Sequence, residues 1–158
     1  MSRQTQKYHL SLAGEYYVAA EIQRRGISAA VTFGNAKKAD VVAFSGASHA
    51  VAIEVKSTPN ARWVVGGSVP PPSPEPWVFV WIPTTATEAP RFYVLNQSQL
   101  FDILNPIDVD YRSRYLAKHG EDYGERRGVV NLSRELAEPF RDRWETIIDL
   151  LKTIPDVR

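Results

Sequence analysis

The chain has 158 residues, of which 44% are apolar and 23% charged, and its formal net charge is +1. This length and composition are typical of one globular domain with a sizeable core and exclude a disordered chain. The small net charge excludes a strong overall basic field, so a polyanionic partner must be bound by a local cluster of cations. The absence of cysteine excludes disulfides, thiolate zinc sites and cysteine nucleophiles.

The N-terminal segment and the apolar runs indicate the compartment. Residues 1–7 are polar and lead to no long apolar stretch, so we expect no signal peptide. The longest apolar run, residues 77–82, is far shorter than the roughly 20 residues that a helix needs to cross a bilayer. We therefore expect a cytoplasmic protein with no membrane partner.

The first expected element is a helix over residues 11–25. Val18 and Ile22 follow Glu15 at spacings of three and seven, so the three side chains share one helical face. Gly26 is a natural end to this helix. Glu15 is unusual, because it lies at the head of the inward stripe where an apolar side chain would be expected.

Three short strands are expected next, over residues 27–33, 39–44 and 50–57, each ending at a turn signal. The spacing of the second and third strands predicts a hairpin. Residues 62–76 contain Gly66-Gly67 and a proline-rich tract. Because proline fits neither a helix interior nor a central strand, we expect a loop there.

The strongest strand prediction is residues 77–82. A continuous β-branched and aromatic run of this kind indicates a strand buried on both faces. Residues 91–95 are expected to be its antiparallel neighbour. A short helix over residues 98–104 should follow, capped by Asn96 or Ser98.

The remaining sequence is expected to be irregular over residues 105–134 and to end in an amphipathic helix between Phe140 and Leu151. The element order predicts an α/β fold with a mixed sheet of about five strands flanked by helices. No internal repeat is evident, so we expect a single domain over residues 1–158. Its core would span about 10–104, with a C-terminal helical extension over about 105–158.

The third expected strand carries the residues of chemical interest. Side chains alternate across a strand, so Glu54 and Lys56 lie side by side on the face opposite Val55. Asp40 lies at the start of the preceding strand, and a hairpin would bring Asp40 next to Glu54. Taken singly, Glu-x-Lys is typical of a solvated pair and a lone aspartate of a turn. Their combination favours a site.

Two neighbouring carboxylates repel each other unless one takes up a proton or a cation lies between them. A hard divalent ion with oxygen ligands, Mg²⁺ or Mn²⁺, fits Asp40 and Glu54, and Glu15 from the helix is either a further ligand or an outer-shell residue. Such a centre suits phosphodiester hydrolysis, since the ion polarises a phosphoryl oxygen and lowers the pKa of a bound water. Lys56 would orient the water or stabilise the developing charge.

Three short motifs together resemble the PD-(D/E)XK nuclease superfamily, which includes type II restriction enzymes and archaeal Holliday-junction resolvases. They are Gly14-Glu15, Ala39-Asp40 and Glu54-Val55-Lys56. The order of elements is most similar to resolvase-type members and to small uncharacterised bacterial members. The resemblance covers about residues 12–57, and Ala39 stands where the motif has proline.

This resemblance implies a restriction-endonuclease-like core and magnesium-dependent cleavage of nucleic acid. It carries metal-ligand roles to Asp40 and Glu54, a helix-acid role to Glu15 and the catalytic-lysine role to Lys56. We expect an endonuclease acting on DNA, with a homodimer by analogy with resolvases. The alternative is a non-catalytic module that keeps the nuclease fold in a nucleic-acid-processing or defence system, as the small net charge and the proline-rich tract suggest.

Further basic and aromatic residues leave two interpretations open. Lys37 and Lys38, just before Asp40, either contact phosphates at the mouth of the site or belong to a solvated loop. Trp63 either approaches substrate or packs in the core. Arginines elsewhere either widen a backbone-binding surface or are ordinary surface charges. These are Arg24, Arg25, Arg112, Arg114, Arg126 and Arg127.

Overall fold

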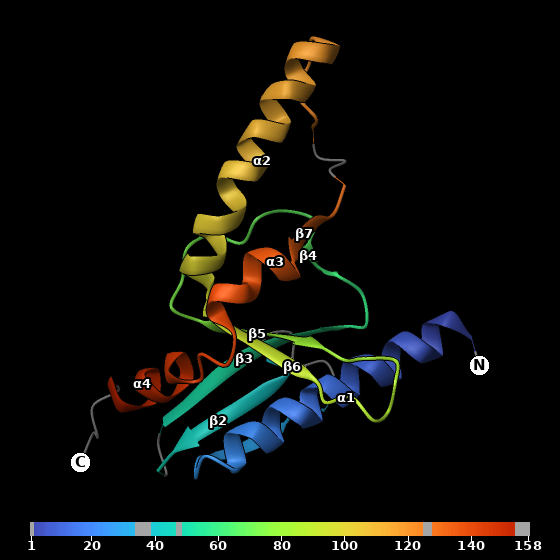
Figure 1. Ribbon diagram of the computed structural model, residues 1–158. Helices are drawn as coiled ribbons and strands as arrows, with labels where there is room; N and C mark the ends of the chain where they lie inside the picture. The colour runs from blue at the N-terminus through green and yellow to red at the C-terminus, as the bar shows by residue number, and fades with distance from the viewer. Residues whose placement is uncertain (1, 34–38, 47–48, 125–127, 154–158) are drawn as a thin grey trace.

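The computed structural model describes residues 2–33, 39–46, 49–124 and 128–153. Its centre is a five-stranded mixed sheet in the order β1-β2-β3-β5-β6, accompanied by a two-stranded sheet of β4 and β7. Helices flank the large sheet, and one long helix stands away from it (Figure 1). The predicted α/β fold with a mixed sheet of about five strands is confirmed.

The elements follow one another as helix, strands, helix and a short helical C-terminal part. In chain order they are α1 (Arg3–Gln23), β1 (Ser28–Val31), β2 (Val41–Ser45), β3 (His49–Thr58), β4 (Arg62–Gly66), β5 (Pro76–Trp81), β6 (Arg91–Asn96), α2 (Gln97–His119), β7 (Val130–Ser133), α3 (Arg134–Ala137), a 3₁₀ turn η1 (Glu138–Phe140) and α4 (Glu145–Thr153).

The long strand β3 organises the large sheet. It pairs antiparallel with β2 through its first half and parallel with β5 through its second half. The remaining pairs, β1 with β2 and β5 with β6, are antiparallel. Because β2 begins at Val41, opposite Ile53, the end of β3 runs on beyond β2. Among the described residues, no strand pairs with this side of β3 from Glu54 onwards, and we call it the open edge of β3.

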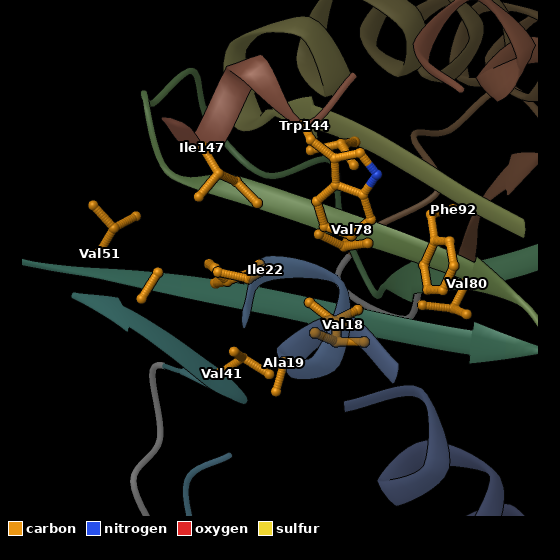
Figure 2. Close-up of a cluster of buried hydrophobic side chains, with 14 of the residues drawn as sticks. Val18, Ala19, Ile22, Val41, Val51, Val78, Val80, Phe92, Trp144 and Ile147 are labelled. Atoms are coloured by element: carbon orange, nitrogen blue, oxygen red, sulfur yellow. The ribbon is translucent and has the colours of Figure 1, made fainter. Parts of the chain in front are cut away.

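Hydrophobic cores lie on both faces of the sheet, and β5 contributes to each. Val78 and Val80 face a cluster that includes Val18 of α1 and Trp144 (Figure 2). Trp77 and Phe79 face a second cluster with residues of β4, α2 and β7. Successive side chains of β5 thus point alternately into the two clusters, so the strand is buried on both faces, as its continuous apolar run predicts.

Helix α2 is much longer than the sequence indicates, so the expectation of irregular structure from residue 105 is wrong as far as His119. A capping box of Asn96 and Gln99 begins the helix, and left-handed Gly120 (φ 75°) ends it. Pro106 lies in its interior and costs one backbone hydrogen bond, but buried Leu100 anchors the preceding turns. The C-terminal part of α2 rises from the body as an arm (Figure 1).

The start of the expected loop over residues 62–76 is also corrected, because Arg62–Gly66 forms β4. Trp63 and Val65 point into the core, whereas Val64 is exposed. Its partner β7 lies far along the sequence and was not expected either. Alternation over so few residues gives little signal, so the pairing decides the conformation.

The C-terminal part is divided where one helix was expected. Phe140 ends a 3₁₀ turn, Asp142 has a positive φ of 52°, and α4 begins only at Glu145. The segment belongs to the body of the fold, because Leu132 and Trp144 are buried in the cores. Within the described part of the chain, no helix is long and apolar enough to cross a membrane.

Candidate functional site

The open edge of β3 is where the predicted acidic residues meet. Asp40 immediately precedes β2, and its backbone N–H donates to the Ile53 carbonyl over 3.1 Å. The β2–β3 register ends at the pair Val41–Ile53, so Asp40 lies just before this pair on one strand and Glu54 just after it on the other. The hairpin therefore brings the two carboxylates to neighbouring positions, as the sequence spacing predicts.

Asp40 also has a structural partner. Its Oδ2 accepts a 2.8 Å hydrogen bond from the backbone N–H of Val55, on the edge of β3 that β2 leaves uncovered. A strand N–H without a partner would be costly to bury, so this bond stabilises the end of the sheet. It engages one oxygen of the carboxylate.

Glu54 and Lys56 are neighbours on one face of β3. The Lys56 ammonium donates to Glu54 Oε1 over 2.6 Å, and both side chains are partly buried. The same ammonium lies 5.7 Å from the centre of the Trp77 ring, within reach of a cation–π attraction. The strand and the neighbouring tryptophan thus hold the lysine in place beside the carboxylates.

Helix α1 approaches this edge very closely at Gly14. A Cβ at this position would overlap the Ser57 hydroxyl and would lie 2.9 Å from the Ser57 Cβ. Only glycine permits such an approach between helix and strand. The next residue, Glu15, is thereby brought into the electrostatic range of Asp40 and Glu54. The fourth predicted residue therefore lies within electrostatic range of the two other carboxylates.

Burial, and after it neighbouring charge, raises the pKa of two of these carboxyls. Burial raises the pKa of the Asp40 carboxyl, the Val55 hydrogen bond opposes this, and the charge of Glu54 raises the pKa further. Burial likewise raises the pKa of Glu15, and the charge of Asp40 adds to the effect. Both carboxyls would be stabilised in their charged form by a nearby cation.

The donor set is all oxygen and fits a hard divalent ion held by one or two carboxylates, with water and substrate completing the shell. Asp40 and Glu54 are the natural ligands, and their charges both raise the pKa of Glu15. The residues described include no group of three or more His, Cys, Asp or Glu side chains arranged to hold an ion. The described residues therefore do not form a metal site in which the protein supplies every ligand.

A cleft of about 740 Å³ opens beside these residues, and Asp40 and Lys56 line it. It continues along the N-terminal part of α1 and the start of β4, where Arg3, Lys7 and Arg62 also line it. Four of these five charged side chains are cations, so the cleft offers positive charge next to the carboxylates. This is a local basic surface on a chain of nearly neutral net charge.

The sequence did not predict a role for Arg3 and Lys7 of α1, because the helix was expected to start only at residue 11. Extended back to its true start, it carries Arg3, Lys7, Ser11 and Glu15 at a spacing of four. Residues four apart form one ridge along a helix. The Ser2 hydroxyl, which accepts from the Thr5 backbone N–H, is a capping signal that could have revealed this start.

Two other predicted contacts have different outcomes. Lys37 and Lys38, expected to contact phosphates, lie outside the described residues. Trp63 is buried, and its indole N–H donates to the Val80 carbonyl over 3.0 Å, so the core interpretation holds. Its edge also forms part of the cleft wall.

Comparison with protein-family models, with curated proteins and with solved structures gives no match. The class of this protein must therefore be argued from its own residues. These residues form a mixed sheet, an acidic cluster at the open edge of β3, a lysine paired with a glutamate, and a cationic cleft.

Proposed function

We propose that this protein is a divalent-metal-dependent endonuclease that hydrolyses phosphodiester bonds in DNA. Its site would be of the PD-(D/E)XK type, with Asp40 and Glu54 as metal ligands, Glu15 beside them and Lys56 as the catalytic cation. The proposal includes Mg²⁺ or Mn²⁺ as the ion, a cytoplasmic location, and a homodimer by analogy with resolvase-type nucleases.

The observation that carries the proposal is the meeting of this carboxylate–lysine group with a cationic cleft. Asp40 and Lys56 belong to both features. Lys56 is fixed by Glu54 over 2.6 Å and does not reach freely into solvent. Clefts with one sign of charge concentrate counter-charged ligands, and phosphates are the natural ligands of Lys and Arg side chains.

Different residues would bind the substrate, stabilise the transition state and hold the metal ion in such a reaction. Arg3, Lys7 and Arg62 would bind backbone phosphates and direct one of them toward the carboxylates. Lys56 would donate hydrogen bonds to the phosphoryl oxygens, where negative charge develops in the transition state. A divalent ion held by Asp40 and Glu54 would polarise the phosphoryl oxygen and lower the pKa of a bound water.

Cleavage assays test the proposal directly. Plasmid, branched and single-stranded DNA are incubated with the protein and Mg²⁺ or Mn²⁺, and Glu54→Gln and Lys56→Met are each expected to abolish cleavage. Glu21→Gln is the matched control, since Glu21 forms an equally short 2.6 Å ion pair with Arg25 at the other end of α1. The proposal fails if wild type cleaves no substrate better than Glu54→Gln does.

Metal binding provides a second measurement that does not depend on turnover. Calorimetric titration of Mn²⁺ into wild type is expected to show one binding event, strongly weakened in Asp40→Asn. The amide can still accept the hydrogen bond from the Val55 N–H, so the edge of β3 should stay intact. Equal Mn²⁺ affinity of the two proteins would exclude Asp40 as a ligand.

A second candidate function is a non-catalytic module that keeps the nuclease fold and binds nucleic acid without cutting it. The direct Glu54–Lys56 ion pair favours this candidate, because it satisfies both charges without an ion. So does the lack of a three-ligand group in the described part of the chain. A protein that binds DNA but neither Mg²⁺ nor Mn²⁺, even with DNA present, would favour the module.

A further inference from the structure

A second cavity lies beneath the arm of α2, beside the proposed cleavage site. It has a volume of about 440 Å³ and is bordered by α2 on one side and by residues 128–131 on the other. This volume lies within the range of roughly 300–1,000 Å³ that is usual for small-molecule pockets. Arg62 lines both this cavity and the cationic cleft, so one arginine side chain lies at the border of each.

The chemistry of this cavity differs from that of the cleft. Tyr111 and Tyr123 contribute aromatic rings, 5.5 Å apart and edge-to-face. Arg112 and Arg114 add cations, which outnumber the single carboxylate, Asp108, in the lining. The Arg114 guanidinium is engaged by Asp110 in a largely exposed ion pair, and that of Arg112, whose side chain is 36% exposed, is engaged by Asp122. Exposed pairs of this kind are weak and are readily exchanged for phosphate.

We propose that this cavity binds the unpaired, single-stranded flank of the nucleic acid whose duplex part lies in the cleft. Aromatic rings next to arginines bind single strands, because every unpaired base offers a face for stacking while the cations contact the backbone. Bases within a duplex are already stacked and cannot use such rings. Arg62, shared by both cavities, would contact the backbone where the strand passes from one to the other.

This inference rests on the proposed function only in that it assumes nucleic acid in the cleft. It adds a preference for substrates with a duplex-to-single-strand junction, which the carboxylate–lysine site does not imply. The competing occupant is a second protein chain, because Val109 and Leu116 on the arm are exposed apolar residues.

Fluorescence anisotropy in EDTA, which prevents turnover, measures the preference. The probes are a blunt DNA duplex and the same duplex with a single-stranded extension. Wild type is expected to bind the extended duplex about tenfold more tightly, the scale of stacking on one aromatic side chain. Tyr111→Ala should remove this preference while leaving blunt-duplex affinity unchanged, and Tyr111→Phe, which keeps the ring, should retain it.

Matched controls exist on α1. Tyr17 is 43% exposed against 47% for Tyr111 and lines neither cavity, so Tyr17→Ala should change nothing. The side chain of Arg24 is 71% exposed and ion-paired within its helix, as Arg114 is at 70%. Arg114→Gln should weaken binding of the extended duplex and lower its salt dependence, whereas Arg24→Gln should not.

The outcomes separate the two proposals. If the duplex is bound and cut with no preference for an extension, the proposed function stands and the single-strand site is refuted. If neither probe is bound, the single-strand site is refuted, and the cleavage assays alone decide the proposed function. If sedimentation shows a dimer that Leu116→Glu dissociates, and the extension preference is absent, the arm is a protein interface and the inference is wrong.

Discussion

Because α1 lies so close to β3 at Gly14, we expect Gly14→Ala to lower the free energy of unfolding. In an ordinary helix interior, replacing glycine with alanine stabilises by about 1 kcal/mol, since alanine restricts the unfolded chain and favours helix. Here the new methyl group would overlap the Ser57 hydroxyl and lie 2.9 Å from the Ser57 Cβ. The usual gain is therefore opposed by a steric cost.

The size of this cost follows from the geometry. Rotation of the Ser57 side chain can move the hydroxyl away but leaves the contact between the two Cβ atoms. Ordinary contacts begin at 3.4 Å, so helix and strand must separate by about 0.5 Å. Overpacking a tight contact costs about 1–3 kcal/mol. After subtraction of the helix-propensity gain, we expect a net loss of about 1 kcal/mol, or about 3 °C in Tm for a chain of this size.

A double-mutant cycle with Ser57→Gly tests this reasoning, with urea unfolding as the assay. Ser57→Gly removes both of the atoms that the new methyl group would meet. In that background Gly14→Ala is expected to stabilise by about 1 kcal/mol, which gives a coupling energy of about 2 kcal/mol between the two sites. If Gly14→Ala stabilises the wild-type chain, or if the coupling is zero, the helix does not approach the strand so closely.

Three further predictions concern charge and packing. Burial raises the pKa of Asp40 in the folded protein, so its ionised form lowers stability at neutral pH, and this penalty vanishes below the unfolded pKa of about 4. Asp40→Asn should therefore raise Tm at pH 7, and the advantage should shrink as the pH falls to about 4 in metal-free buffer. Leu104→Ala should cost about 3 kcal/mol in urea unfolding, because the side chain is 2% exposed, whereas Leu116→Ala, at 50%, should cost almost nothing. Asn96→Ala removes the cap of α2 and should cost about 1 kcal/mol in the same assay.

The sheet was predictable wherever a strand has a strong local pattern. The apolar run of β5 indicates burial on both faces, and in the structure its side chains are buried in the cores on both faces of the sheet. Strands β4 and β7 were missed because each is short and is stabilised by the other across a long stretch of sequence. Helix α2 was expected to end at Leu104 because the following residues are largely polar, whereas its capping box and its left-handed end at Gly120 lie outside that stretch.

The candidate site was predictable to the extent that it depends on strand alternation and hairpin register. These rules set Glu54 beside Lys56, and they bring Asp40 to the end of the hairpin near Glu54. Glu15 drew attention because it interrupts an apolar stripe, but the reason for its position is the glycine before it, which lets the helix come close. The cleft was not predictable, because β4 and the first turns of α1 were both unrecognised as its walls.

The ridge of α1 relates the cleft to the carboxylates. Arg3 and Lys7 line the cleft at one end of this ridge, and Glu15 lies near Asp40 at the other end. The charge therefore changes sign along a single row of side chains. A polyanion drawn to the arginine and the lysine would be repelled at the carboxylates unless a cation neutralised them. Metal and nucleic acid should accordingly raise each other's affinity by the same factor, because linkage between two ligands is reciprocal.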